Sequence, residues 1–146
     1  MSENAKAIIL VEDNLDDVEL TLAEFKRHNL SNAILVLRDG AAALEYIFCT
    51  GAYADRHDKD PKVILLDLNL PKMSVLDVLR RIKADPATRT IPVVVLTSSN
   101  EERDLIKTHN LGANSYIVKP INFEQFIESM RQIGLHWLLL DNPPVL

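Results

Sequence analysis

Short apolar runs alternate along this chain with segments whose apolar residues recur at helical spacing. The runs occupy residues 7–11, 33–37, 63–66, 92–96 and 115–118, and each has the length of a strand. The first, third and fourth are almost continuously Val, Ile and Leu, as expected for strands that helices cover on both faces. Because parallel strands need crossover connections, this alternation predicts an α/β domain with a parallel sheet.

Capping residues mark where the helices between these strands begin. Asn14, Asp39 and Asn122 each precede a helical segment, and Asp85-Pro86 ends another. We expect helices over 15–25, 41–48, 76–84 and 101–108, and a fifth from residue 123 onward. The apolar stripe of the first is Leu15, Val18, Leu22 and Phe25, and that of the fifth is Phe123, Phe126, Ile127, Met130, Ile133 and Trp137. Strict alternation predicts the flavodoxin-like (βα)5 fold, a doubly wound parallel five-stranded sheet of order 2-1-3-4-5.

The composition limits the classes of protein to which the chain can belong. Its 146 residues, 47% hydrophobic and 25% charged, are typical of one soluble domain, expected over 1–140 with a short tail over 141–146. No stretch suggests a signal peptide or a membrane span. A formal net charge of −5 without a basic run argues against nucleic-acid binding. The single cysteine, Cys49, has no bridging partner, so the cytoplasm is the expected location.

Polar residues follow the expected strands at the points where a parallel sheet of this kind binds ligands. Glu12-Asp13 follows the first strand, Asp67 the third, Thr97 the fourth, and Lys119, followed by Pro120, the fifth. Taken singly, each residue has an ordinary structural explanation. Asp13 or Asp67 would be a helix cap, Thr97 a loop hydroxyl and Lys119 a solvated lysine. Their joint occurrence at the carboxyl ends of four strands favours a functional site.

The residue types at these positions suit phosphoryl chemistry. Three carboxylates at about 4 Å repel one another by about 1 kcal/mol per pair in water and about 4 kcal/mol at a protein surface. Mg²⁺, a hard cation that prefers one or two carboxylates and a phosphate oxygen, would offset that repulsion. With the metal and Lys119 nearby, a phosphoryl group arriving at Asp67 would have its charge neutralised, and Thr97 could donate to its oxygens.

At these residues the chain resembles the receiver domains of two-component response regulators. The likeness runs from about residue 7 to about residue 137, and its segments are IILVEDN, VILLDLNLPKM, IPVVVLTSS and ANSYIVKP. It implies that Asp67 is the phospho-acceptor and that the metal ligands are Glu12, Asp13, Asp67 and the main-chain carbonyl of Asn69. A sensor histidine kinase is then the partner, and the protein is a signalling protein rather than an enzyme, although slow self-dephosphorylation is expected.

The same resemblance gives roles to three further residues. Thr97 corresponds to the switch hydroxyl and Lys119 to the lysine that contacts the phosphoryl group, and the Lys119-Pro120 bond is expected to be cis. Tyr116 falls at the switch aromatic of the family. From its sequence context alone, Tyr116 is equally well explained by half-buried packing in the last strand.

Finer features, including LRDGAAALEYI and IGLHWLLL, are similar to stand-alone regulators that pair with cyanobacterial phytochrome kinases. Such regulators lack a DNA-binding domain and form homodimers through the fourth helix, fifth strand and fifth helix. The chain carries surplus apolar residues near its carboxyl end, and we expect the dimer interface to include Phe123, Ile127, Leu135, Trp137 and Leu138. The alternative is that the last turn folds back on its own domain.

The sequence departs from the receiver pattern at two places, and three other interpretations are considered. Glu12 replaces the commoner Asp, and Ser74-Val75 stands where many relatives have Asp-Gly, which predicts a stiffer or reshaped loop beside Asp67. A degenerate receiver that binds partners without phosphorylation is therefore one alternative. A phosphatase with an Asp nucleophile is the second alternative, but it would need a second acid where Asn69 stands. A flavin-binding electron carrier is the third, but Glu12-Asp13 would repel the phosphate of the flavin.

Overall fold

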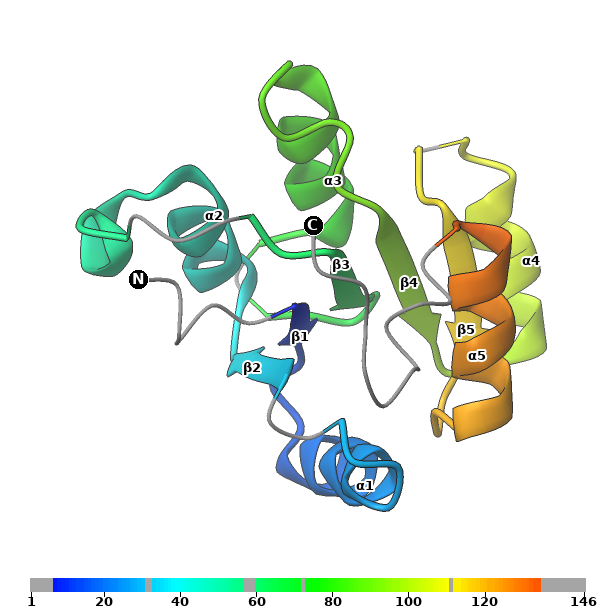
Figure 1. Ribbon diagram of the computed structural model, residues 1–146. Coiled ribbons are helices and arrows are strands. Elements are labelled where there is room, and N and C mark those ends of the chain that lie inside the picture. Colours follow the sequence, from blue (N-terminus) through cyan, green and yellow to red (C-terminus); the bar gives the residue numbers. More distant parts are fainter. Residues whose placement is uncertain (1–6, 31–32, 57–59, 72, 111, 135–146) are drawn as a thin grey trace.

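The computed structural model describes residues 7–30, 33–56, 60–71, 73–110 and 112–134. Within them, five parallel strands form one sheet in the order β2-β1-β3-β4-β5 (Figure 1). The strands are β1 (Ile8–Val11), β2 (Ile34–Leu37), β3 (Val63–Asp67), β4 (Val93–Thr97) and β5 (Ser115–Val118). The helices are α1 (Leu15–Lys26), α2 (Gly40–Phe48), the short 3₁₀ helix η2 (Gly51–Tyr53), α3 (Val75–Ala84), α4 (Asn100–Lys107) and α5 (Phe123–Gln132). The predicted flavodoxin-like fold and strand order are confirmed.

Helices cover both faces of the sheet, and the core is accordingly divided into two clusters. Successive residues of a strand point to opposite faces. Ile9 of β1 therefore packs in the cluster under α2 and α3, whereas Leu10 packs in the cluster under α1 and α5. In Figure 1, α2 and α3 lie above the sheet and α1 lies below it. The aromatic rings of Phe25 and Phe126 meet in the second cluster with centroids 4.6 Å apart, which joins α1 to α5.

The predicted caps form, but one residue of the predicted core does not. The side chains of Asn14, Asp39 and Asn122 each accept a hydrogen bond from a backbone N–H three residues further on. Leu15, expected in the apolar stripe of α1, is instead 59% exposed, so that expectation was wrong. Leu15 is the first helical residue, and it lies where the chain leaves the end of β1, beyond the buried surface of the sheet.

Ser74-Val75, for which a stiffer or reshaped loop is predicted, forms the start of α3. Ser74 is the N-cap of α3, where its hydroxyl accepts from the N–H of Leu76, and Val75 is the first helical residue. Neither residue has a positive φ, so no glycine is needed here. The Val75 side chain is 3% exposed and packs in the cluster under α2 and α3. Val75 therefore contributes to the core without backbone strain.

Two further observations concern the helices. α5 ends at Gln132, and Trp137, expected on its stripe, lies outside the described residues. None of the helices within the described part of the chain is both long enough and apolar enough to cross a membrane.

Candidate functional site

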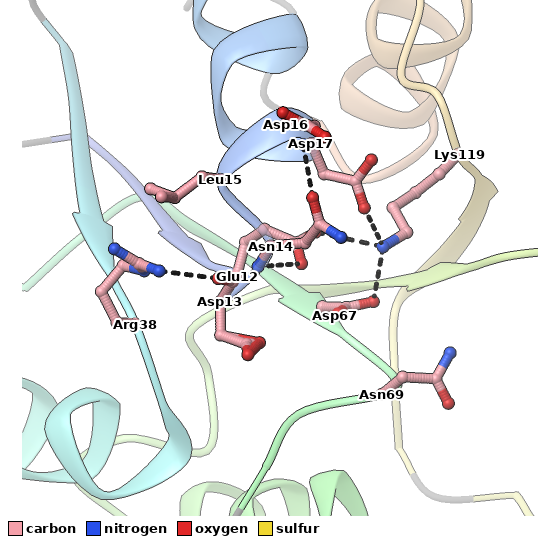
Figure 2. A pocket seen from close by; sticks show the side chains of 10 residues that line it. All are labelled: Glu12, Asp13, Asn14, Leu15, Asp16, Asp17, Arg38, Asp67, Asn69 and Lys119. Carbon is pink, nitrogen blue, oxygen red and sulfur yellow. Dashed lines mark hydrogen bonds and ion pairs between the residues drawn. The ribbon is translucent and has the colours of Figure 1, made fainter.

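The carboxyl ends of the strands meet at one edge of the sheet, which we call the carboxyl rim. Asp67 and Thr97 are the last residues of β3 and β4, and Glu12 and Lys119 directly follow β1 and β5. Because the strands are parallel and in register, these four side chains are brought to one place. An open cavity of about 610 Å³ lies there (Figure 2). It is lined by Glu12, Asp13, Asn14, Leu15, Asp16, Asp17, Arg38, Asp67, Asn69 and Lys119.

The Lys119 ammonium contacts three carboxylates of this cavity. Its Nζ lies 2.8 Å from Oδ2 of Asp17, 3.1 Å from Oδ1 of Asp67 and 3.2 Å from Oε1 of Glu12. Figure 2 shows the lysine reaching across the cavity toward these carboxylates. Burial alone would lower the pKa of Lys119, but the hydrogen bond to Asp17 and the charges of Asp67 and Glu12 outweigh it and raise that pKa. Lys119 is therefore held as a cation.

Glu12 is nearly inaccessible at the base of the cavity, with 1% of its surface exposed. Burial, a hydrogen bond with Asp67 and the charge of Asp67 raise the pKa of Glu12 to about 7. Its Oε2 accepts a hydrogen bond from the N–H of Asn14 at 3.3 Å. The adjacent buried carboxyl groups of Glu12 and Asp67 thus depend on Lys119 for charge compensation.

Among the described residues, Asp67 is the buried residue with a side-chain oxygen that lacks a hydrogen bond. It is 3% exposed, and its Oδ1 accepts no hydrogen bond from the described residues, although the Lys119 ammonium is at ion-pair distance. A buried carboxylate oxygen without a donor is costly unless a further ligand satisfies it. The cavity holds five carboxylates and two cationic side chains, so its formal charge strongly favours an additional cation.

The oxygen-rich lining fits Mg²⁺ better than it fits a transition metal. Among the described residues, no group of three or more His, Cys, Asp or Glu side chains is placed so that it could hold a metal ion by itself. Mg²⁺ keeps several waters and takes only one or two carboxylates, with phosphate oxygens completing its shell. The side chains on the carboxyl rim are thus compatible with that ion.

The other predicted residues, Asp13, Asn69 and Thr97, lie at or next to the carboxyl rim, where each makes a hydrogen bond to a group other than Asp67. Asp13 is half-buried, and its main-chain carbonyl accepts from the Arg38 guanidinium at 2.7 Å. Asn69 is exposed, and its side-chain amide donates to Glu102 at 3.5 Å. Thr97 is fully buried, and its hydroxyl donates to the carbonyl of Ser99 at 3.4 Å. The threonine hydroxyl is thus bonded within its own loop rather than to Asp67. The Lys119-Pro120 peptide bond is cis, as expected.

Tyr116, Phe123 and Ile127 do not line the cavity. Tyr116 is half-buried, with Lys107 Nζ 5.6 Å from its ring centroid, and burial raises the pKa of its phenol. It lines a second cavity, of about 500 Å³, between α4, β5 and α5. Phe123 stacks on His28, in the turn that follows α1, with ring centroids 3.5 Å apart, and Ile127 is half-buried. Phe123 therefore uses one ring face within the chain, and Leu135, Trp137 and Leu138 lie outside the described residues.

Two residues of the site were not predicted from the sequence. Asp17 was interpreted only as a helix residue, yet it makes the shortest contact with Lys119. Asp17 lies in the first turn of α1, which follows directly from the carboxyl end of β1, and that proximity to Glu12-Asp13 was an available signal. Arg38 follows β2 directly, so the strand-end rule that identified the other residues applies to it as well.

Comparison with known proteins assigns a class to this fold and this set of side chains. The chain belongs to the response regulator receiver domain family, whose model matches residues 8–131. It is therefore the receiver domain of a two-component response regulator, a signalling protein.

Several relatives are regulators linked to phytochromes. Response regulator Rcp1 of Synechocystis is 38% identical over 137 residues, which cover 94% of this chain and 92% of Rcp1. The solved structure of bacteriophytochrome response regulator RtBRR is 47% identical, with a TM-score of 0.85 over 96% of this chain and 84% of that one. That of AtBRR is 46% identical, with a TM-score of 0.86 over 94% and 99%. The predicted likeness to phytochrome regulators is confirmed, and it extends to the bacteriophytochrome group.

Proposed function

We propose that this chain accepts a phosphoryl group on Asp67 from a phosphohistidine of a sensor histidine kinase, in an Mg²⁺-dependent reaction. The observation that carries the proposal is the Asp67 carboxylate, which is buried, lacks a hydrogen-bond donor on Oδ1 among the described residues and lies 3.1 Å from the Lys119 ammonium. A nucleophile in that setting is desolvated and adjacent to a fixed positive charge.

The transfer is a displacement at phosphorus. A carboxylate oxygen of Asp67 forms the new P–O bond, and the P–N bond of the phosphohistidine breaks. The imidazole nitrogen leaves with the electron pair and regains a proton. Lys119 neutralises charge on the phosphoryl oxygens, and hydrolysis of the acyl phosphate returns Asp67 to its carboxylate. The Thr97 hydroxyl reaches those oxygens only by leaving its hydrogen bond to Ser99.

Mg²⁺ would be held by Glu12, Asp13, Asp67 and the main-chain carbonyl of Asn69. When bound, the ion supplies positive charge to the phosphoryl oxygens as transfer proceeds. Support comes from the cavity lining, in which five carboxylates outnumber two cationic side chains. The Rcp1 structure, 37% identical with a TM-score of 0.70, is described as Mn²⁺-bound.

The kinase partner is proposed to be a phytochrome. RtBRR and AtBRR are described as bacteriophytochrome response regulators, and RcpA as a phosphorylated cyanobacterial phytochrome response regulator. Phosphorylation is proposed to strengthen a homodimer through the α4–β5–α5 face, with Tyr116 of β5 and Ile127 of α5 as candidate contacts. The receiver domain is proposed to extend over residues 1–140, to act in the cytoplasm and to contact neither nucleic acid nor membrane.

Phosphorylation can be measured by intact mass after incubation with a small-molecule phosphodonor and Mg²⁺. We expect a gain of one phosphoryl group that disappears with Asp67→Asn and with a chelator. Asp77→Asn, which removes an exposed carboxylate of α3, should retain the gain. If the folded wild-type protein gained no mass, the proposal would fail and the degenerate receiver would replace it.

A further inference from the structure

Asp17 is a carboxylate of the site to which the proposed function assigns no role. We infer that Asp17 is a positioning residue that competes with the phosphoryl group for the Lys119 ammonium, and so weakens retention of that group on Asp67. This inference rests on the proposed function and names one more residue that regulates the same site.

The distances and the hydrogen bonds both favour Asp17 as the preferred partner of Lys119. The contact with Oδ2 of Asp17 is 2.8 Å, shorter than those with Glu12 and Asp67. Lys119 donates hydrogen bonds to Glu12 and to Asp17, whereas Asp67 Oδ1 receives none from the described residues. The ammonium is thus beside the proposed acceptor, but its shortest contact is with Asp17.

The first turn of α1 fixes where the Asp17 carboxylate lies. Asn14 caps the helix, and its side-chain oxygen accepts from the N–H of Asp17 at 3.1 Å. The N–H of Asn14 is bonded in turn to Glu12. In Figure 2 the Asp17 side chain extends from this turn toward Lys119. Its position therefore follows from the cap and does not depend on a mobile loop.

A phosphoryl group on Asp67 changes the competition for Lys119. It carries about −1.5 to −2 charge and three strong acceptor oxygens. To donate to those oxygens, the ammonium must give up some of its hydrogen bonding to Asp17, whose negative charge then also faces the phosphoryl group. Both effects make the phosphorylated state less stable than it would be with a neutral side chain at residue 17.

The chain offers a matched control in the neighbouring residue. Asp16 lies on the same first turn and lines the same cavity, but the ion pairs of Lys119 with described residues involve only Glu12, Asp17 and Asp67. Asp17→Asn and Asp16→Asn change the net charge equally and preserve side-chain size. A difference between them isolates the contact with Lys119 from the general electrostatic field.

The experiment measures the affinity for beryllofluoride, a mimic of the phosphoryl group, at saturating Mg²⁺ on the full chain. We expect Asp17→Asn to bind it about 5- to 10-fold more tightly than wild type, since one opposing charge is removed. Asp16→Asn should lie within about twofold of wild type, because Asp16 is exposed to solvent, which screens its charge, and makes no ion pair with Lys119 among the described residues. The conservative Asp17→Glu should restore weaker binding. Affinity for Mg²⁺ alone, measured in parallel, should change equally in both Asn variants.

Each outcome bears on the inference. Equal affinities in the two Asn variants would show that Asp17 acts only as a helix residue, and weaker binding in Asp17→Asn would show that it orients Lys119 for the phosphoryl group. Either result would overturn the inference while leaving the proposed function intact. Absence of Mg²⁺-dependent binding in the wild type would contradict the proposed function and the inference together.

Discussion

Single side chains join elements that are far apart in the sequence, and Lys83 of α3 is one of them. Its ammonium donates to the carbonyls of Arg89 and Ile91 and to the side chain of Asn114, which itself accepts from the N–H of Val93. We predict that Lys83→Met lowers the free energy of unfolding by about 1 kcal/mol, because partly buried carbonyls lose their donor. Denaturant unfolding measures this loss. The exposed Lys26→Met should change stability by less than about 0.5 kcal/mol.

The same lysine predicts a pH dependence. Burial lowers the pKa of Lys83 below its usual 10.5. Between that lowered value and 10.5, the unfolded chain binds the proton more tightly than the folded chain does, so rising pH stabilises the folded state. The stability difference between wild type and Lys83→Met should therefore grow as pH approaches 10.5. A difference that shrank over this range would contradict the assignment.

The start of α3 shows how a helix can tolerate a departure from the pattern of its family. Val75 has helical backbone angles and a buried side chain, so glycine would bring no conformational benefit there. We predict that Val75→Gly destabilises the protein by about 2–3 kcal/mol, through lost burial and a more flexible unfolded chain. Thermal or denaturant unfolding would measure the effect.

Val75→Ala separates the two contributions, since it removes most of the buried side chain and keeps the backbone restriction. It should cost about 1 kcal/mol less than Val75→Gly. Phosphorylation yield should be the same in both variants. If Val75→Gly instead raised the yield severalfold at unchanged stability, the valine would be a functional restraint on the loop next to Asp67.

For the molecule as a whole, the central prediction is a change of oligomeric state on phosphorylation. The α4–β5–α5 face carries a cavity lined largely by polar side chains, and the half-buried Ile127 lies on α5. We expect the phosphorylated protein to be a dimer by light scattering, and Ile127→Lys to keep it monomeric with the same phosphoryl gain, because a buried charge opposes association.

Leu20→Lys supplies the control for that experiment, because Leu20 is a 58% exposed apolar residue on α1. It should leave the dimer intact. Monomers in both phosphorylation states at all tested concentrations would refute the prediction, and equal disruption by both lysine variants would point to an interface elsewhere.

Local sequence signals were sufficient for much of this protein. The apolar runs, the caps at Asn14, Asp39 and Asn122, and the polar residues after four strands depend on neighbours within a few positions, and they predicted the fold and the carboxyl rim. The pattern was less reliable for Leu15, because helical periodicity does not indicate where the sheet beneath a helix ends. It also did not reveal that the ring of Phe123 stacks on His28.

The sequence by itself determined the order of the elements, the strands that carry Glu12, Asp67, Thr97 and Lys119, and the single edge at which they meet. Only the tertiary structure decided how those groups share their charges and hydrogen bonds. Asp17 and Lys119 are separated by 102 positions, yet their contact is the shortest ion pair of the site. Such pairing depends on distances of a few tenths of an ångström and on which atoms water no longer reaches, and both arise only when helices and sheet pack together.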